Sequence, residues 1–243
     1  MKKKVIMTLL IIMPLAMLLT CGGPEQKKMK FFNKGKALYE KGDYVKAGLE
    51  FKNAIQIDPK FADAHYMLGM VALQKGDMRG GFGALSKTVE LDPNHLNAQN
   101  QLGKLYLGAG MTDKALEKAE LVLKADAKNE DGLLLRGAIF LAKKDSAGAR
   151  QFLEGLIAQG LKKPDVYTLL AASYMQKQDL KGAERVLLDG VPVNPKSTIL
   201  YTALADLYIG TKRTDDAIAT IQKVIELEPD NNRHKIALSG LYW

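Results

Sequence analysis

Residues 28–61 read KMKFFNKGKALYEKGDYVKAGLEFKNAIQIDPKF, the first copy of a unit that recurs every 34 residues. One phase of the unit takes only small residues, which are Gly35, Gly69, Gly103, Gly137, Ala171, Ala205 and Ser239. A second small-residue phase comprises Ala47, Gly81, Ala115, Ala149, Ala183 and Ala217. Small residues at two fixed phases indicate that two backbones approach closely in every copy. The chain is therefore predicted to be an array of one repeated structural unit.

Each unit is predicted to form two helices joined by a tight turn. In the first unit, apolar and small residues have helical spacing from Phe31 onward. Gly42 suits the left-handed conformation that ends a helix, and Asp43 can cap the next helix. Helical spacing resumes over residues 47–55, and Pro59 stops the second helix because proline lacks the amide donor.

The repeated units account for one continuous domain over residues 28–243. Six full units begin at Lys28, Ala62, Leu96, Glu130, Pro164 and Thr198, and a truncated seventh begins at Asn232. The glycine between the two helices recurs at Gly42, Gly76 and Gly110, then becomes Lys144, Gln178 and Lys212. A side chain at a left-handed position costs up to about 1 kcal/mol. Units four to six are therefore predicted to turn slightly differently from the first three.

These marks resemble the tetratricopeptide repeat (TPR) family over residues 28–243. The matching phases on first helices are Leu68/Gly69/Ala72, Leu102/Gly103/Tyr106, Leu170/Ala171/Tyr174 and Leu204/Ala205/Tyr208. On second helices they are Ala47/Phe51/Ala54, Ala149/Leu153 and Ala217/Ile221, and prolines follow at Pro59, Pro93, Pro195 and Pro229. Lys34 and Arg136 depart from the leucine that is usual at their phase. The resemblance implies an all-α fold, a right-handed superhelical solenoid of stacked helical hairpins.

The resemblance also implies a place for a ligand, because first helices line the concave face in this family. The candidate groove residues, carried over by phase, are Phe32, Lys36, Tyr39, Tyr66, Met70, Leu73, Asn100, Lys104 and Leu107. Bulky, adaptable side chains of this kind suit an extended or helical peptide. The alternative interpretation is that Phe32, Tyr39 and Tyr66 only pack against neighbouring helices. A carboxylate clamp is not expected, since the paired asparagines it needs are missing.

The sequence contains no pattern typical of an enzyme. None of His65, His95 and His234 has a Cys, Glu or second His at metal-ligand spacing. No serine motif resembles a nucleophile elbow, and no glycine-rich loop is followed by Lys-Ser/Thr. We therefore expect no catalytic residue, metal, cofactor or small-molecule substrate. The formal charge of +8 comes from lysines scattered along the chain, which favours a solvated surface over nucleic-acid binding.

The N-terminus has the pattern of an export signal. Residues 1–4 are basic at three positions, and residues 5–19 form an apolar stretch interrupted only by a threonine and a proline. This stretch is shorter than the roughly 20 apolar residues of a membrane-spanning helix. A signal peptide is therefore predicted over residues 1–20. An uncleaved signal anchor and an ordinary secretory signal are the alternatives.

The residues that follow the apolar stretch resemble the bacterial lipobox, in which the cysteine becomes the lipidated first residue of the mature protein. They read Leu-Leu-Thr20-Cys21-Gly22, with Thr20 in place of the usual Gly, Ala or Ser. Residues 21–27 are predicted to be a short lipidated tether. Because Gly22 stands where an Asp would favour inner-membrane retention, we expect an outer-membrane lipoprotein facing the periplasm, with the inner membrane as the less favoured site.

The seventh unit, from Asn232 to Trp243, has a first helix but no second helix to cover it. This predicts a frayed last helix and an exposed apolar end, in a fragment of a longer array or in a protein whose C-terminus docks elsewhere.

The sequence as a whole predicts a lipid-anchored scaffold that binds a protein or peptide in its concave groove. Residues 50–54 and 133–137 resemble TPR lipoproteins of exopolysaccharide export and exosortase systems. A pilotin or outer-membrane assembly factor for a secretin or pilus is the alternative.

Overall fold

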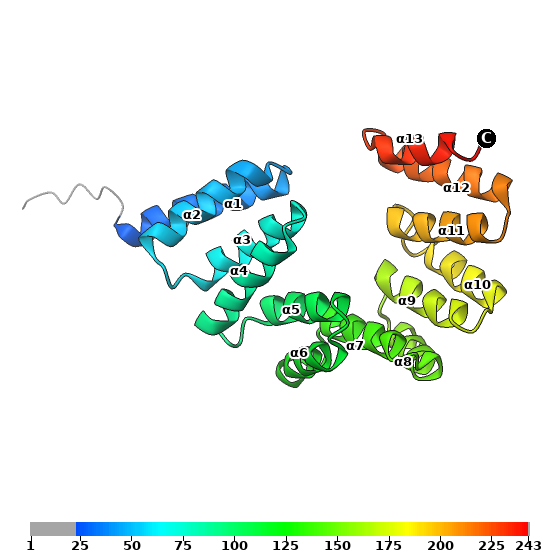
Figure 1. The fold of residues 1–243 in the computed structure, drawn as a ribbon, viewed down its shortest axis with the longest axis horizontal. Coiled ribbons are helices and arrows are strands. Elements are labelled where there is room, and N and C mark those ends of the chain that lie inside the picture. Colours follow the sequence, from blue (N-terminus) through cyan, green and yellow to red (C-terminus); the bar gives the residue numbers. More distant parts are fainter. Residues whose placement is uncertain (1–22, 243) are drawn as a thin grey trace, which may run out of the picture.

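A computed structural model describes residues 23–242, and every regular element in that range is an α-helix (Figure 1). The predicted signal peptide, Cys21 and Trp243 lie outside the described residues. The helices are α1 (Pro24–Glu40), α2 (Tyr44–Ile57), α3 (Ala62–Gln74), α4 (Met78–Leu91), α5 (Leu96–Gly108), α6 (Thr112–Ala125), α7 (Glu130–Ala142), α8 (Ser146–Ala158), α9 (Pro164–Met175), α10 (Leu180–Gly190), α11 (Thr198–Gly210), α12 (Thr214–Leu227) and α13 (Asn232–Ser239).

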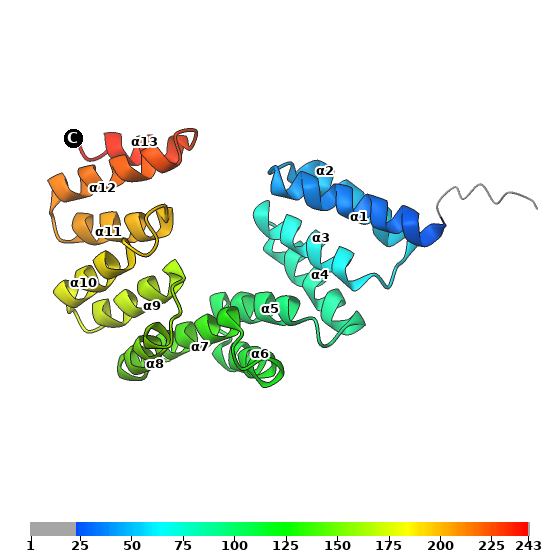
Figure 2. The same cartoon turned by 180° about the vertical axis from the view of Figure 1, so that it is seen from behind.

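Consecutive helices pack as pairs, and the pairs stack one on the next into an arc (Figures 1 and 2). First helices of the pairs, such as α5 and α9, lie on the inner side of the arc, and their partners α6 and α10 lie on the outer side. In the second half of the chain, α5 contacts α7, α7 contacts α9, and α9 contacts α11. The predicted all-α array of helical hairpins is confirmed. No helix among residues 23–242 is both long and apolar enough to cross a lipid bilayer.

The tight contact between the two helices of a pair depends on the small residues. A Cβ added at Gly35 would lie 2.6 Å from Cε1 of Phe51, and one at Gly137 would lie 2.7 Å from Cδ2 of Leu153. Ala47 and Ala149, at the second small-residue phase, have no exposed surface. The close backbone approach predicted from the repeat is therefore present, and it lets short helices bury large partners such as Phe51.

Aspartates begin most of the second helices. Asp43, Asp77, Asp145 and Asp179 each accept a hydrogen bond from the backbone N–H three residues later, at 2.8–3.1 Å. Such caps satisfy an amide that has no partner within the helix and stabilise the helix by about 1 kcal/mol. The capping role predicted for Asp43 is confirmed.

The turns of units four to six differ only slightly from those of the first three. Lys144, Gln178 and Lys212 have φ of 59°, 58° and 61°, in the same left-handed region as Gly42 and Gly76 at 77° and 78°. The same pair of backbone hydrogen bonds closes each turn, so the side chain is accommodated at an energetic cost and the geometry is kept. Helix pairing and stacking on both sides of the turn outweigh that local cost.

The N-terminal end of the array is closed by charged side chains. Lys34 stands at a phase that usually holds leucine, on the first helix of the described residues, and its Nζ lies 2.6 Å from Oε1 of the buried Glu50. Lys28 is also buried, with Nζ 2.8 Å from Glu25 and 2.9 Å from Asp58. Because Pro24 starts α1 and Lys28 anchors its first turn, residues 24–27 are helical and are not part of a flexible tether, contrary to the prediction.

The C-terminal end lacks such a closure within the described residues. Helix α13 has no buried side chain, and Ile236 and Tyr242 are 70% and 64% exposed.

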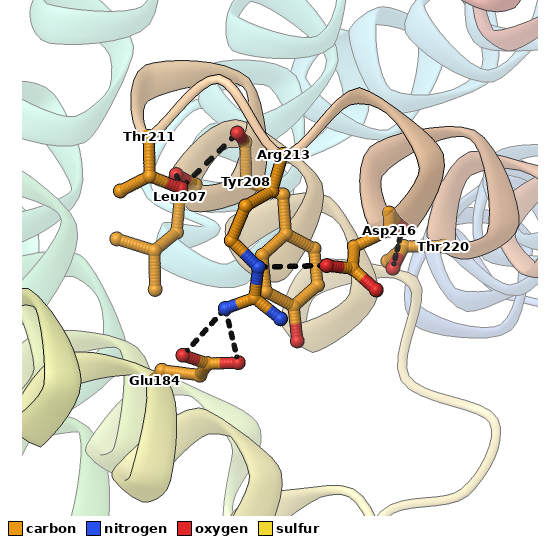
Figure 3. A network of polar contacts seen from close by, with 7 residues as sticks. All are labelled: Glu184, Leu207, Tyr208, Thr211, Arg213, Asp216 and Thr220. Carbon is orange, nitrogen blue, oxygen red and sulfur yellow. Dashed lines mark hydrogen bonds and ion pairs between the residues drawn. The ribbon is translucent and has the colours of Figure 1, made fainter.

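A polar network joins the fifth and sixth units of the array (Figure 3). Arg213 lies between Glu184 and Asp216 in this network, and its guanidinium covers the ring of Tyr208 at 4.4 Å.

Candidate binding groove

The inner side of the arc contains two adjoining hollows. The first, of about 420 Å³, lies between α5, α7 and α9, and the second, of about 380 Å³, lies between α9, the start of α10, and α11. Thr168 of α9 lines both, so they form one trough, called here the inner groove. Its walls in the first hollow combine Leu107, Leu134 and Leu169 with charged groups, which are Lys104, Asp131 and Asp165.

Two of the residues predicted for a ligand line this trough directly. Lys104 is exposed and Leu107 is half-buried, and both belong to α5. Lys36 is also exposed, on α1, with its Nζ 5.9 Å from the centre of the Phe32 ring. Met70 of α3 is half-buried.

Tyr39 and Tyr66 are half-buried residues of the first two units. The ring of Tyr39 contacts that of Tyr44 at 5.2 Å between centres, and the ring of Tyr66 lies 4.7 Å from that of His95. Burial raises the pKa of the Tyr66 phenol, and the negative charge of Asp131 also raises it. A charge from the fourth unit therefore influences a phenol of the second unit.

Three of the predicted residues contribute mainly to internal packing. Phe32 is 9% exposed, with its ring 4.8 Å from that of Phe61 and 5.8 Å from that of Phe51. Leu73 packs against the core cluster formed around Leu85. Asn100 is 3% exposed, and its Nδ2 donates to Oδ1 of Asn129 at 3.5 Å. The groove assignment as a whole remains a prediction.

The sequence did not reveal a contact that His95 makes between two first helices. Nδ1 of His95 accepts the N–H of Ala98 at 3.1 Å and so caps α5. Its Nε2 lies 3.3 Å from Oδ1 of Asp63 on α3. The signal available in the sequence was a polar side chain at an N-cap position, although Ser, Thr, Asp and Asn are the usual residues there.

Lys163 makes a second contact between units, and the sequence did not reveal it. Its Nζ lies 3.0 Å from Glu130 and 3.3 Å from Asp131, at the edge of the inner groove. The groove therefore presents a leucine-rich floor with Lys104, which makes no ion pair within residues 23–242, with Asp131, which pairs with Lys163, and with the exposed Asp165. Such a surface suits a polypeptide that offers apolar side chains together with both signs of charge. Among residues 23–242, no cluster of three or more His, Cys, Asp or Glu side chains is placed to hold a metal ion.

Comparison with protein families gives three matches along the chain. The TPR repeat family matches residues 35–76, and tetratricopeptide repeat families match residues 100–164 and 199–231. Together these segments span more than half of the sequence. No curated protein sequence matches the chain significantly.

Solved structures share the fold at low sequence identity. PilF of Pseudomonas aeruginosa superposes with a TM-score of 0.62 at 15% identity, over 90% of this chain and 99% of that one. PilW, a type IV pilus biogenesis factor, gives a TM-score of 0.68 at 14% identity, over 88% and 99%. A tetratricopeptide repeat protein of Parabacteroides merdae gives 0.61 at 21% identity, over 87% of both chains.

The family matches fall on segments whose helices pair and stack as the 34-residue spacing predicts. Tetratricopeptide repeats are protein-interaction modules, and the inner groove gives this chain a surface of that kind. The chain belongs to the tetratricopeptide repeat proteins and is a protein-interaction scaffold.

Proposed function

We propose that this protein is a lipid-anchored scaffold of the bacterial cell envelope that holds a partner polypeptide in its inner groove and performs no chemistry. The observation that carries the binding half is the inner groove itself, where Lys104, Asp131 and Asp165 surround a leucine-lined floor. The anchoring half rests on the lipobox-like sequence at Cys21 and on Gly22, which favours the outer membrane facing the periplasm. A role in exopolysaccharide export or protein sorting is supported by the likeness of residues 50–54 and 133–137 to scaffolds of such systems.

A second candidate function is that of a pilotin or assembly factor for a secretin or pilus. The support for it is size as well as shape, since the chain covers 99% of both PilF and PilW. Deletion of the gene distinguishes the two candidates. Loss of surface polysaccharide with normal secretin multimers supports the export role, and loss of secretin multimers or pili supports the assembly role.

The groove is tested with the variants Lys104→Glu, Leu107→Ala and Leu169→Ala, three residues that line it, combined in one protein. We expect the captured partner in crosslinked membranes to fall about tenfold or more, because apolar contacts and a charge are removed together. Lys124→Glu, an exposed charge reversal on α6, is the control. Unchanged capture by the triple variant would remove the inner groove from consideration.

The anchor is tested independently by metabolic labelling with a palmitate analogue and by membrane fractionation. The wild-type chain is expected to incorporate label and to sediment with outer membranes. Cys21→Ser is expected to lose both properties. Recovery of unlabelled, freely soluble wild-type protein would contradict anchoring while leaving partner binding intact.

A further inference from the structure

The outer side of the arc carries its own groove, next to the N-terminus of the array. It is a hollow of about 560 Å³ between α2 and α4, with Leu68 and Val71 of α3 in its floor, and it is called here the outer groove. It lies between second helices, whereas the inner groove lies mainly along first helices. A ligand in one groove would therefore leave the other free.

Small residues on both walls keep the outer groove open. Gly48 of α2 and Gly80 and Ala84 of α4 line it. The positions that correspond to Ala84 hold Phe152 and Val186 in units four and five. In that part of the array, the corresponding hollow between α8 and α10 measures about 350 Å³, and Tyr167 and Tyr174 line it.

An apolar pair that is absent from other units stands at the rim of the outer groove. Val45 and Leu49, one turn apart on α2, are 71% and 59% exposed. The corresponding pairs in the next five units are Arg79/Gly83, Asp113/Glu117, Ala147/Gln151, Lys181/Arg185 and Asp215/Ala219. In these other units the two positions hold polar or small residues, as expected for a solvent-exposed helix face. Two large aliphatic side chains therefore mark this one groove as a contact surface.

The charge around the outer groove is predominantly positive. Lys46, Lys52 and Lys75 line it, together with Asp77. The carboxylate of Asp77 already accepts the N–H of Gly80 at 2.8 Å, and Lys46 is paired with Asp43 at 2.9 Å. Lys52 and Lys75 make no ion pair among the residues that the structure describes. Two lysines are therefore available to a ligand.

The lysines are concentrated in the first unit and are not scattered evenly along the chain. Residues 24–60 contain nine lysines against five acidic residues, and residues 61–243 contain 23 basic and 22 acidic residues. The first unit is thus a local centre of positive charge in an otherwise balanced array. An anionic partner would be drawn to this end of the arc.

We propose that the outer groove binds an amphipathic helix of a partner protein that carries an apolar stripe flanked by acidic residues. Helices α2 and α4 have 14 residues each, which corresponds to walls of about 21 Å and to a ligand helix of about four turns. Val45, Leu49 and Val71 contact the apolar stripe, and Lys52 and Lys75 pair with the flanking carboxylates. The complementary charge selects this occupant over a basic or neutral helix.

The test uses the full-length chain in phosphatidylcholine nanodiscs and two fluorescent, hydrocarbon-stapled helices of about 15 residues. Both helices carry leucines on one face, and the flanks are glutamate in one helix and lysine in the other. We expect the glutamate helix to bind about tenfold or more tightly than its lysine twin, and to weaken as salt is raised. Leu49→Asp and the pair Lys52→Glu/Lys75→Glu should each reduce its affinity about tenfold or more.

Leu188→Asp is the matched control, because Leu188 is an exposed leucine of α10 outside the outer groove. It should bind like the wild type, and circular dichroism should show that all variants keep the helical fold. Equal affinity for the two helices, no binding of either, or binding unaffected by Leu49→Asp would overturn the proposal.

A membrane surface is the competing occupant, and a separate arm detects it. Val45→Cys in a Cys21→Ser background, which lacks the lipid anchor, is labelled with an environment-sensitive dye and mixed with neutral nanodiscs or with nanodiscs containing 30% phosphatidylglycerol (about one anionic lipid in three). We expect the same spectrum in both when no helix is added. A blue shift confined to the anionic nanodiscs would assign the patch to lipid and overturn the proposal.

Discussion

Arg213, at the turn between α11 and α12, donates from Nη1 to both carboxylate oxygens of Glu184 on α10, each at 2.8 Å (Figure 3). Its Nε donates to Asp216 at 2.7 Å. A planar guanidinium can make these contacts while it covers the ring of Tyr208, and an ammonium group cannot. The contact ties the sixth unit to the fifth through side chains, in addition to the apolar stacking between their helices.

We predict that Arg213→Lys lowers the melting temperature by roughly 1–3 °C, because the bidentate contact and the ring contact are lost together. The measurement is thermal unfolding followed by circular dichroism, with Arg79→Lys as the control, since Arg79 makes no ion pair within residues 23–242. In a double-mutant cycle, Glu184→Gln should remove most of the effect. An equal loss in the Glu184→Gln background would show that the pair is not coupled.

The left-handed turns give a second prediction. Lys144→Gly, Gln178→Gly and Lys212→Gly should each raise the free energy of unfolding by about 0.5–1 kcal/mol, because glycine occupies positive φ without the penalty of a side chain. Urea unfolding measures the change. Lys143→Gly, one residue earlier at φ −77°, should have the opposite sign, because glycine there loosens the helix end and removes the ion pair between Lys143 and Asp113. Destabilisation by all four substitutions would show that the side chains at positive φ contribute favourable contacts.

The repeat period predicted the helical pairs and the positions of their turns, and the first unit predicted the Asp43 cap, because small residues and turn residues act over a few positions of the chain. Helices α3, α5, α7, α9, α11 and α13 begin at the residues where predicted units begin. Contacts between units could not be predicted in the same way. His95 meets Asp63, and Arg213 meets Glu184, across about one repeat length, and these pairings depend on how far each unit rotates on the next.

The candidate site was predictable only in part, for the same reason. Helical phase indicates which residues belong to the inner side of a first helix, as for Lys104 and Leu107. It does not indicate how much of each side chain the neighbouring unit covers, and Phe32 and Asn100 are almost fully buried. The outer groove depends on small residues of two different units, so no single unit reveals it.

A third prediction concerns the close contact at Gly35. Gly35→Ala should destabilise the protein by about 1–3 kcal/mol, because its Cβ would lie 2.6 Å from the buried ring of Phe51. Gly83→Ala on α4 is the matched control, since nothing lies within 4 Å of an added Cβ there. The control should gain about 0.5–1 kcal/mol from helix propensity alone. Stabilisation by both substitutions in urea unfolding would mean that Phe51 moves aside freely.

Acid should weaken the N-terminal end of the array in a defined window. The hydrogen bond from Lys28, with that from the Lys60 backbone, lowers the pKa of the Asp58 carboxyl below its ordinary value. A group with a lowered folded pKa stabilises the protein fully above its unfolded pKa, and that stability is lost as pH falls through the folded value. The loss should therefore occur below about pH 4.

The measurement for this acid effect is the melting temperature of the wild type and of Asp58→Asn between pH 7 and pH 3. The two proteins should differ most at neutral pH and converge in acid, because protonated Asp58 no longer pairs with Lys28 as an ion. Asp230→Asn, at an exposed residue beside α13, is the control and should follow the wild type throughout. A constant difference across the whole range would exclude ionisation of Asp58 as its cause.

The C-terminal helix gives the last prediction, because its packing differs from that of every other helix described. No side chain of α13 is buried, whereas Leu200 and Leu204 of α11 are 0% and 3% exposed. Amides of residues 236–242 should therefore exchange with solvent much faster than those of residues 204–208 in hydrogen exchange followed by mass spectrometry.

Substitutions test the same difference in packing. Ile236→Lys should change the melting temperature by no more than about 1–2 °C, as expected for an exposed site. Leu200→Ala, the buried counterpart, should cost about 2–5 kcal/mol. Slow exchange across α13 in a monomer, together with strong destabilisation by Ile236→Lys, would mean that this end of the array packs against another part of the chain.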